Sequence, residues 1–308
     1  MNKIQIVSDL KGCSNIWKEV ISEKSIFDSW EFRECFNKNF KRPPYFIISE
    51  NKGKVNWFLP MSYIEEEGNY THFPGETWNG KTWLEGNRIA FKNSKHKKEI
   101  FNYLKKKGIK YHLRYLIYPL LAKFNEIDET GYLFFPKQFN YDLNNYFKTF
   151  SHKSRQTLKK ELCKLEEKGV SFRFNSLKDF DLMIKWNIQR YKENSYFYDS
   201  RFLNSFKDVL NFLHKNNFLW LTTILIGGEP AAIDLGCLFK NQYTILAGGT
   251  NEKFPGVAKL INIYHMHKVC EEHISKVDFL CGDFSWKKLF HLTPRPLYLL
   301  SNISFSPR

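Results

Sequence analysis

The sequence predicts a mixed α/β protein built from two domains of related topology. Its 308 residues accommodate two domains of ordinary size, each with a full hydrophobic core. The second half of the chain indicates strands and helices in the order β-β-β-α-β-α-β. The first half shows a weaker copy of this order, in which the turn at 50–54 corresponds to the turn at 226–230. We therefore expect an N-terminal domain over residues 1–145 and a C-terminal domain over 146–308.

In the second half, Ser151 and Gly169 have the residue types that cap and close a long helix. Leu158, Leu162 and Leu165 form one apolar stripe on this helix, and basic residues occupy its other faces. The elements that we predict are a helix over 151–169, a strand over 170–174, helices near 178–194 and 202–215, strands over 218–226, 231–239 and 243–249, a helix over 256–273, a strand over 277–281, a short helix near 285–290 and a strand near 297–305.

In the first half, two apolar runs within 45–64 flank Asn51-Lys52-Gly53, which predicts a β-hairpin. Pro60 indicates that the second strand lies at a sheet edge or carries a bulge, because proline cannot donate to a strand ladder. A lysine-rich helix is expected over 94–107. The other elements predicted are strands near 69–73, 82–91, 111–118 and 131–136, and a helix that begins near Asp142.

The chain is strongly basic, with a formal net charge of +15. Such a balance favours an anionic partner, which would be a nucleotide cofactor, a nucleic acid or an anionic membrane surface. The lysine-rich composition is equally typical of an AT-rich genome, so the charge alone does not choose a partner.

Other features point to a cytoplasmic protein without a metal. No run of about 20 apolar residues predicts a membrane span, and the N-terminus lacks the apolar stretch of a signal peptide. The six cysteines are scattered and form no CxxC pair, as is typical of reduced core thiols.

The segment 253–260 leaves a strand, crosses a short loop and opens a helix. Gly256 and Ala258 would let the backbone come close to a ligand, and the free N–H groups of a helix start suit a pyrophosphate. Lys253 and Lys259 would add positive charge. The same residues also fit an ordinary loop-to-helix junction, and both interpretations stay open at this point.

The pattern Lys253-x-x-Gly256-x-Ala258 resembles the acyl-CoA pyrophosphate loop of GNAT acetyltransferases, with Lys in place of the usual Arg or Gln. The flanking residues resemble a narrower branch, the FemAB-like and CelD-like acyltransferases. The matching segments are Ser-His-Lys-Ser-Arg at 151–155, Gly-Glu-Pro-Ala-Ala at 228–232, Asp278-Phe279, Gly282-Asp283 and Trp286-Lys287. This resemblance covers residues 150–300 well and 25–135 only in outline.

The resemblance implies two tandem GNAT-like domains, each a mixed and mostly antiparallel sheet flanked by helices. It implies that the C-terminal domain binds the donor, while a degenerate N-terminal domain lies on the acceptor side. The donor-binding residues that it implies are Gly248, Lys253, Gly256, Val257, Ala258 and Lys259. Carried over from the same branch, Lys287 steadies the oxyanion of the reaction with Trp286 beside it.

Several other polar residues in apolar surroundings are candidates. Asp278 and Asp234 each lie in an apolar strand, where a buried carboxylate needs a partner. Asp278 would orient Lys287, help to deprotonate the amine, or make a structural hydrogen bond. Tyr264 is a candidate proton donor to a leaving thiolate, although a core or surface position is the simpler reading.

The resemblance leaves two donors open. Acyl-CoA would make the chain an N-acyltransferase, with an amine on an envelope, polysaccharide or nucleotide-sugar precursor as the acceptor. Aminoacyl-tRNA would make it a FemX-like transferase that forms peptide bonds on a cell-wall precursor, which the basic segments 95–107 and 153–164 favour. A non-catalytic nucleic-acid or envelope-binding module on a degenerate fold is the third possibility.

Overall fold

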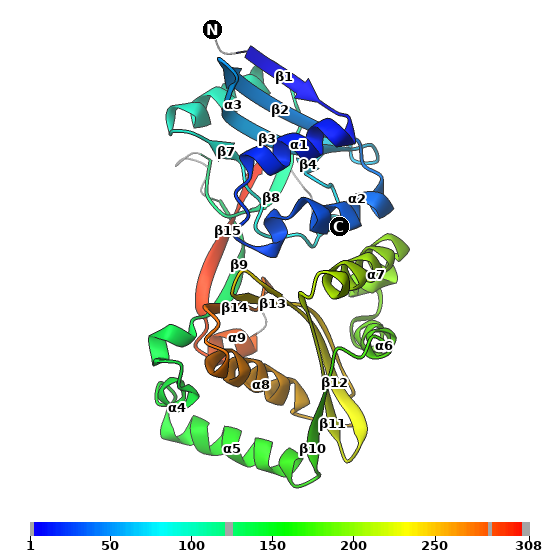
Figure 1. The fold of residues 1–308 in the computed structure, drawn as a ribbon, viewed down its shortest axis with the longest axis vertical. Helices are drawn as coiled ribbons and strands as arrows, with labels where there is room; N and C mark the ends of the chain where they lie inside the picture. The colour runs from blue at the N-terminus through cyan, green and yellow to red at the C-terminus, as the bar shows by residue number, and fades with distance from the viewer. Residues whose placement is uncertain (1–2, 121–125, 283–284, 304–308) are drawn as a thin grey trace. The chain divides into compact units, whose positions relative to one another are not determined.

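The structure is a computed structural model that describes residues 3–120, 126–282 and 285–303. The chain divides into two compact units (Figure 1). Unit 1 comprises residues 1–130, 204–209 and 296–308, and unit 2 comprises residues 131–203 and 210–295. No helix in the described ranges is both long and apolar enough to cross a membrane.

Unit 1 is built around an antiparallel sheet in the order β1-β2-β3-β4, with the short β7 also paired to β3. An antiparallel pair joins β8 to the last strand, β15, and is the end of the eight-stranded sheet β10-β11-β12-β13-β14-β9-β15-β8. The elements of this unit are β1 (Lys3–Val7), α1 (Leu10–Val20), α2 (Trp30–Phe40), β2 (Pro44–Asn51), β3 (Lys54–Ile64), β4 (Asn69–His72), β5 (Thr77–Trp78), β6 (Lys81–Thr82), β7 (Ala90–Phe91), α3 (Lys95–Lys106) and β8 (His112–Leu116), while β9 (Glu126–Phe134) and β15 (Thr293–Ser301) cross the unit boundary.

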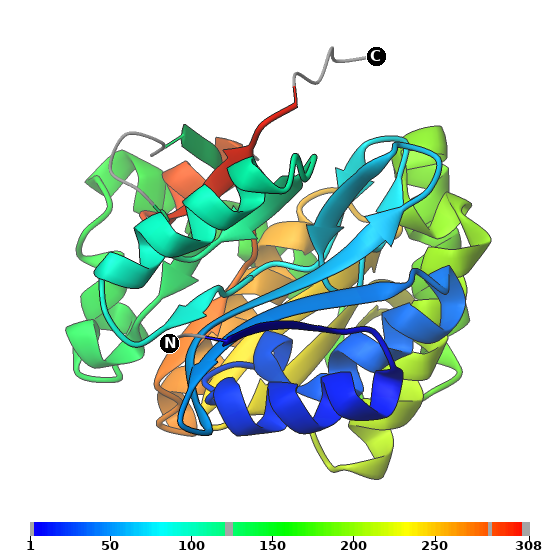
Figure 2. The same cartoon turned by 90° about the horizontal axis from the view of Figure 1, so that it is seen from above.

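Helices cover both faces of the β2–β3 hairpin, as Figure 2 shows. Side chains alternate along a strand, so each face of the hairpin has its own core. Ile47, Trp57, Leu59 and Met61 pack with Ile100 and Leu104 of α3. Phe46, Ile48 and Phe58 pack with Cys13 and Trp17 of α1 on the other face.

The hairpin, the helix predicted over 94–107 and the alternative of a bulge in the second strand are confirmed, but the strand predicted over 82–91 is wrong. Strand β3 is not at an edge, because β2 pairs one side of it and β4 and β7 pair the other. Its bulge lies near Asn56, and Pro60 falls between the stretches that pair with β7 and β4. The strand predicted over 82–91 is mostly loop, because the Glu76 side chain binds the amides of Trp83 and Leu84 that a strand partner would otherwise bind.

Unit 2 is built around strands in the order β10-β11-β12-β13-β14-β9. All of these pairs are antiparallel except β13–β14, which is parallel. The elements are α4 (Leu143–Phe147), α5 (His152–Glu166), β10 (Val170–Phe174), α6 (Asp179–Tyr191), β11 (Leu219–Ile226), β12 (Glu229–Phe239), β13 (Gln242–Thr250), α8 (Val257–Glu271), β14 (Lys276–Asp278) and α9 (Ser285–Leu289). Helix α7 (Ser200–Lys215) is shared, because its residues 204–209 belong to unit 1.

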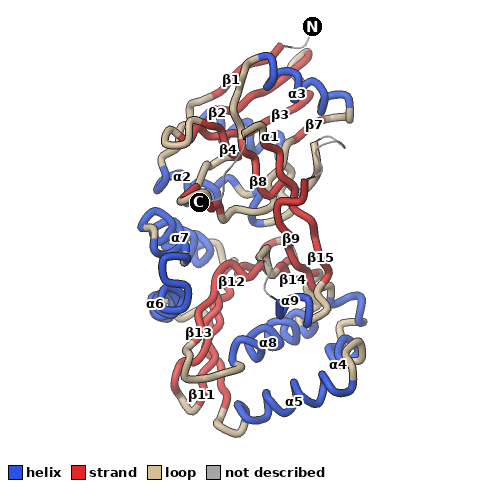
Figure 3. The backbone as a smooth tube through the Cα atoms, turned by 180° about the vertical axis from the view of Figure 1, so that it is seen from behind, coloured by secondary structure: helices blue, strands red, loops and turns tan. Residues whose placement is uncertain are grey.

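Helices α5 and α8 lie on one face of the β11–β13 strands, and α6 lies on the other (Figures 1 and 3). Leu165 of α5 and Val257 and Ile261 of α8 pack on Ile224 and Ala232 of the sheet. Ser151 caps α5 as predicted, because its hydroxyl accepts a hydrogen bond from the Ser154 amide. The predicted mixed α/β class with sheets flanked by helices is therefore confirmed.

Candidate active site

The site begins where β13 gives way to α8. Gly256 is the N-cap of α8 and has a φ of 91°, a left-handed conformation that favours glycine. A Cβ on Gly256 would meet only Leu165 Cδ1, at 3.8 Å. The protein itself therefore leaves the space over this helix start open, and a larger side chain would occupy it.

Two backbone amides at this helix start have no acceptor among the residues that the structure describes. They belong to Gly256 and Ala258. The amide of Val257 donates to Phe254 O at 3.2 Å, and that of Lys259 donates to Gly256 O at 2.9 Å. Two free N–H groups with the positive end of the helix dipole behind them can hold anionic oxygens.

Lys253 and Lys259 flank this helix start, and each forms a surface ion pair. Lys253 Nζ lies 2.6 Å from Glu229 Oε2, and Lys259 Nζ lies 2.5 Å from Glu161 Oε2. Ion pairs between partly exposed side chains are weak. Either lysine can therefore exchange its carboxylate for a phosphate. The Val257 side chain is buried in the core, so this residue anchors the loop rather than facing its open side.

The sheet opens beside the same loop. Strands β13 and β14 pair in parallel over three residue pairs only, from Gln242↔Lys276 to Thr244↔Asp278. Strand β14 ends there, while β13 continues to Thr250 and bulges at Leu246 against β12. Over residues 245–250, β13 has no strand partner on that side within the described ranges. Gly248 lies in this open stretch, and its carbonyl accepts a hydrogen bond from Asn187 Nδ2 at 2.8 Å.

Three buried polar side chains on the α8 face of the sheet form a chain of hydrogen bonds. His265 Nε2 lies 3.0 Å from Asp234 Oδ2, and His265 Nδ1 lies 3.2 Å from the Tyr243 hydroxyl. Burial, and secondarily the Asp234 carboxylate, raises the pKa of Tyr243 well above its usual value. Two glycines make room for this cluster, since a Cβ on Gly248 would lie 2.2 Å from Asp234 Oδ1 and one on Gly236 2.3 Å from the Tyr243 ring.

Lys287 is buried, and its ammonium donates to the carbonyls of the segment that follows β14. Its Nζ lies 2.9 Å from Phe279 O, 2.9 Å from Leu280 O and 2.7 Å from Cys281 O. The aromatic ring near the ammonium is that of Tyr132, at 5.4 Å from the ring centroid. In this structure Lys287 therefore fixes the backbone of 279–281.

Trp286 and Asp278 stabilise the same segment. Trp286 packs edge-on against Phe279 and Phe290. Asp278 is buried and accepts from the Leu280 amide at 3.0 Å and from Arg295 at 2.8 Å. Of the Gly-Asp element in the family pattern, Asp283 lies outside the described residues.

Tyr264 lies away from the helix start. It is eight residues beyond Gly256, about 12 Å along the α8 axis at the usual rise per residue. Its ring stacks on Phe172 at 4.2 Å, and burial raises the pKa of its hydroxyl. With His265 it lines a cavity of about 330 Å³ against the second half of α8.

The sequence reasoning missed Asn187 and the partnership of Asp234 with His265. Asn187 has no sequence signal, since it is one polar residue of an amphipathic helix. Asp234 and His265 are each polar in an apolar stretch, a signal that points to a partner without naming it. No group of three or more His, Cys, Asp or Glu side chains in the described ranges is arranged to hold a metal ion.

Comparison with known proteins agrees with this geometry. Residues 152–288 match the family described as Acetyltransferase (GNAT) domain. A search of curated proteins finds no match.

Solved structures of low sequence identity share the fold over nearly the whole chain. One is L-PGS from Bacillus licheniformis, 13% identical, with a TM-score of 0.58 over 96% of this chain and 93% of that one. Another is FemX, 10% identical, with a TM-score of 0.55 over 95% of each chain. A third is a tandem GNAT protein from the clavulanic acid biosynthesis pathway, 8% identical, with a TM-score of 0.53 over 97% of each chain. At these identities the likeness concerns the fold.

The open helix start at Gly256, the parted strands β13 and β14 and the match over residues 152–288 all fall in one part of the chain. Residues 152–288 match the GNAT acetyltransferase domain, and the chain is an acyltransferase.

Proposed function

We propose that this acyltransferase moves an acyl group from acyl-CoA to an amine acceptor. The observation that carries the proposal is the pair of free amides at Gly256 and Ala258, with Lys253 and Lys259 on either side. Amides at a helix start favour phosphate oxygens, and the pyrophosphate of CoA supplies them. The motifs around this loop favour the FemAB-like and CelD-like branch.

Donor binding belongs to the C-terminal domain, residues 146–308, in this proposal. Helix α3 holds the corresponding place in unit 1, but it begins with Ser94-Lys95-His96 and has no glycine at its start. The N-terminal domain, residues 1–145, then serves the acceptor, an amine on an envelope, polysaccharide or nucleotide-sugar precursor. The reaction takes place in the cytoplasm, where the donor is made.

The chemistry is direct transfer. The amine nitrogen attacks the thioester carbonyl carbon, which forms a C–N bond and an oxyanion. Collapse of this intermediate breaks the C–S bond, while the amine loses a proton and the thiolate gains one. The edge of β13 near Gly248, which has no strand partner within the described ranges, offers N–H groups for the oxyanion.

Lys287 contributes mainly through position in this mechanism. Three carbonyl oxygens already accept from its ammonium, so direct contact with the oxyanion requires that one of them be released. Together with Trp286 and Asp278, Lys287 instead fixes the segment 279–281, which follows β14 beside the opening of the sheet.

Aminoacyl-tRNA is the second candidate donor, and the surface of α5 favours it. Five basic side chains of this helix are exposed, which gives a positively charged face to unit 2; they are Lys153, Arg155, Lys159, Lys160 and Lys164. Such a face binds phosphates without reading sequence.

Two measurements on the purified chain test the donor. Native mass spectrometry identifies what the protein retains, and calorimetry compares CoA with aminoacyl-tRNA. We expect CoA to be retained and to bind. Retention of tRNA with no measurable heat from CoA would replace the first candidate by the second, and binding of neither would reject both.

A further inference from the structure

Unit 1 contains a parting of parallel strands like the one in unit 2. Strands β4 and β8 meet at a parallel bridge between Tyr70 and Tyr111. Beyond it, β8 is bridged to Asn87 at Leu116 and no longer to β4. The residues that follow the first bridge on each strand, Thr71 and His112, therefore line a wedge between the two strands.

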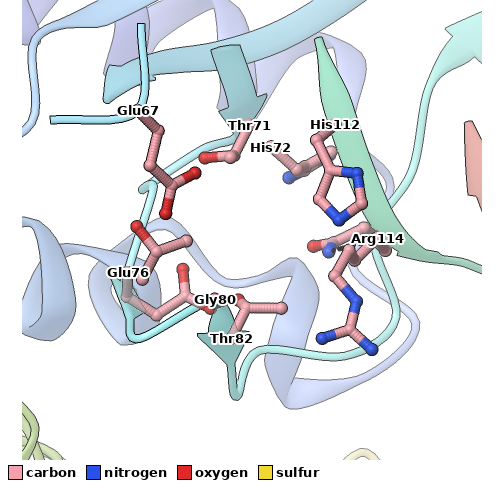
Figure 4. Close-up of a pocket in the computed structure, with 10 residues that line it drawn as sticks. Glu67, Thr71, His72, Glu76, Gly80, Thr82, His112 and Arg114 are labelled. Atoms are coloured by element: carbon pink, nitrogen blue, oxygen red, sulfur yellow. Dashed lines mark hydrogen bonds between the residues drawn. The ribbon is translucent and has the colours of Figure 1, made fainter. Parts of the chain in front are cut away.

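The wedge holds a small polar pocket, shown in Figure 4. Glu67, Thr71 and Glu76 lie along one wall, and His112 and Arg114 lie along the other. Within it, the centre of a water-sized group has about 20 Å³ in which to move. This is room for one small polar group and is too little for a ring.

Two oxygen atoms on the acidic wall have no hydrogen-bond partner in the described ranges, and one of them, Thr71 Oγ1, is buried. Glu76 is 2% exposed, and its Oε1 accepts from the Thr82 hydroxyl, from the Leu84 amide at 2.9 Å and from the Trp83 amide at 3.3 Å. Its Oε2 accepts none. Thr71 is 7% exposed, and its buried Oγ1 also has no partner. An unsatisfied buried acceptor costs about 1–3 kcal/mol, so Thr71 Oγ1 calls for a donor, and Glu76 Oε2 can accept from the same group.

The positive groups around the pocket are neutral or already paired. Burial, and secondarily Arg114, lowers the pKa of His112 to about 4. The Arg114 guanidinium lies 2.8 Å from Asp128 and 3.4 Å from Glu129.

Two further basic side chains, those of His72 and Arg33, lie behind the pocket. Burial, and secondarily Arg33, lowers the pKa of His72 to about 3. Arg33 spends its hydrogen bonds on Phe27 O, Phe73 O and Asn87 Oδ1. Arg33 donates these bonds to neutral acceptors, so its charge acts on Glu76 from behind the pocket and lowers the pKa of this carboxyl against the larger, opposite effect of burial. Inside the pocket, the basic side chains that the structure describes are neutral or paired, which favours a cationic ligand over an anion.

We propose that the wedge of unit 1 is a binding site for a primary ammonium group. The ammonium donates to Glu76 Oε2 and Thr71 Oγ1, and Glu67 at the mouth adds a second carboxylate. An ammonium has three donors and nearly the size of a water molecule, so it matches both the unsatisfied oxygens and the space. This proposal goes beyond the transferase reaction and does not depend on which donor the chain uses.

Backbone amide NMR of the whole chain tests the site with ethylammonium as the probe. Ethanol, acetate and K⁺ at matched ionic strength serve as comparison ligands. We expect saturable shifts of the Trp83 and Leu84 amides, which donate to Glu76, with ethylammonium alone. Equal shifts with K⁺ or ethanol, or shifts that never saturate, would show that the pocket takes any small solute or water and would overturn the proposal.

Variants separate binding from folding. Glu76→Gln keeps an acceptor for Thr82, Trp83 and Leu84 but removes the charge. We expect the dissociation constant for ethylammonium to rise about tenfold, in line with a lost charge-assisted hydrogen bond. Thr71→Val keeps the shape and removes the unpartnered hydroxyl, so it should weaken binding several-fold while raising the melting temperature of the ligand-free chain.

Glu65→Gln is the matched control. Glu65 is exposed in the turn that contains Glu67, but it does not line the pocket. It should leave the shifts unchanged. Unchanged ethylammonium affinity in folded Thr71→Val would contradict the assignment even if Glu76→Gln fails to fold.

Discussion

Gly248 lies directly opposite Asp234 across strands β12 and β13, and a Cβ on Gly248 would lie 2.2 Å from Asp234 Oδ1. The same carboxylate lies 3.0 Å from His265 Nε2, which in turn links to Tyr243. The glycine thus gives the space that a buried polar cluster needs, at the point where the sheet opens. The missing side chain at Gly248 therefore has a structural role in the protein itself, in addition to any role in binding a ligand.

Replacing Gly248 with alanine should therefore destabilise the fold. Forcing one extra methyl into this contact is expected to lower the free energy of unfolding by about 1–3 kcal/mol. Denaturant unfolding measures this, and the double variant Gly248→Ala/Asp234→Ala gives the control. In the Asp234→Ala background the alanine at 248 should have little further effect; an equal loss in both backgrounds would mean that the strain lies elsewhere.

Acidification should weaken unit 1 through His72. The pKa of this imidazole is lowered by burial from 6.5 to about 3. Between these values the unfolded chain binds a proton that the folded chain does not bind, so stability falls as the pH is lowered and is unaffected above that window. The unfolding midpoint should fall less steeply between about pH 6.5 and 4.5 in His72→Gln than in the unchanged chain. Parallel curves for the two proteins would exclude His72 as the titrating group.

The sequence predicted the regular part of unit 2 well because apolar spacing and turn residues agree there. Strands β11 to β13 and helix α8 lie within a few residues of their predicted bounds. Strand β14 was predicted to be longer, because the apolar run 277–281 does not reveal that Lys287 binds the carbonyls of 279–281. The loop after Glu76 was missed for a similar reason, since one buried carboxylate there replaces a strand partner.

The candidate site follows the same division. The helix start at Gly256 can be predicted from the sequence, because glycine, proline and lysine lie together at the junction of a strand and a helix. The hydrogen-bond partners of Lys287, Asp278 and Asp234 cannot be predicted from the sequence, because each partner is distant in sequence or is a backbone group. A polar residue in an apolar stretch of sequence predicts that its side chain needs a partner. Only the folded structure shows which residue that partner is.

The donor loop is tested at Gly256. A glutamate there would fill the open space over the helix start and place a negative charge against the pyrophosphate. We expect Gly256→Glu to weaken CoA binding by at least about a hundredfold, by loss of favourable charge at the helix start and addition of repulsion, as measured by calorimetry. Gly53→Glu is the matched control, because Gly53 also has a positive φ and nothing within 4 Å of its Cβ position. Equal CoA affinity in both variants would show that the loop is only structural.

The exposed face of α5 tests the alternative donor. If tRNA binds there, affinity should fall steeply with salt, and Lys159→Glu/Lys160→Glu should weaken it and flatten the salt dependence. Lys105→Glu/Lys106→Glu on α3 makes the same change in charge on another exposed basic helix. With acyl-CoA as donor, we expect both double variants to keep their turnover. Loss of turnover in the α5 variant alone would favour the tRNA-dependent reaction.

The contacts of Lys287 make a last prediction. Three backbone carbonyls accept from its ammonium, and the side chain is buried. Lys287→Met keeps the apolar stem and leaves these carbonyls without their donor. Each unsatisfied buried group costs about 1–3 kcal/mol, so the free energy of unfolding should drop by several kcal/mol.

Turnover then separates the two roles of Lys287. If it acts by fixing segment 279–281, the variant should alter both kcat and KM along with stability, because the wall of the site is displaced. If its ammonium instead meets the oxyanion, kcat should fall by about 10²–10³ with donor affinity and stability nearly intact. We expect the first pattern, since in the folded chain the ammonium already has three acceptors. Lys288→Met, on the exposed neighbour, should match the unchanged protein in all three measurements. A fall in kcat alone in Lys287→Met would reject the positioning role and restore direct contact with the oxyanion.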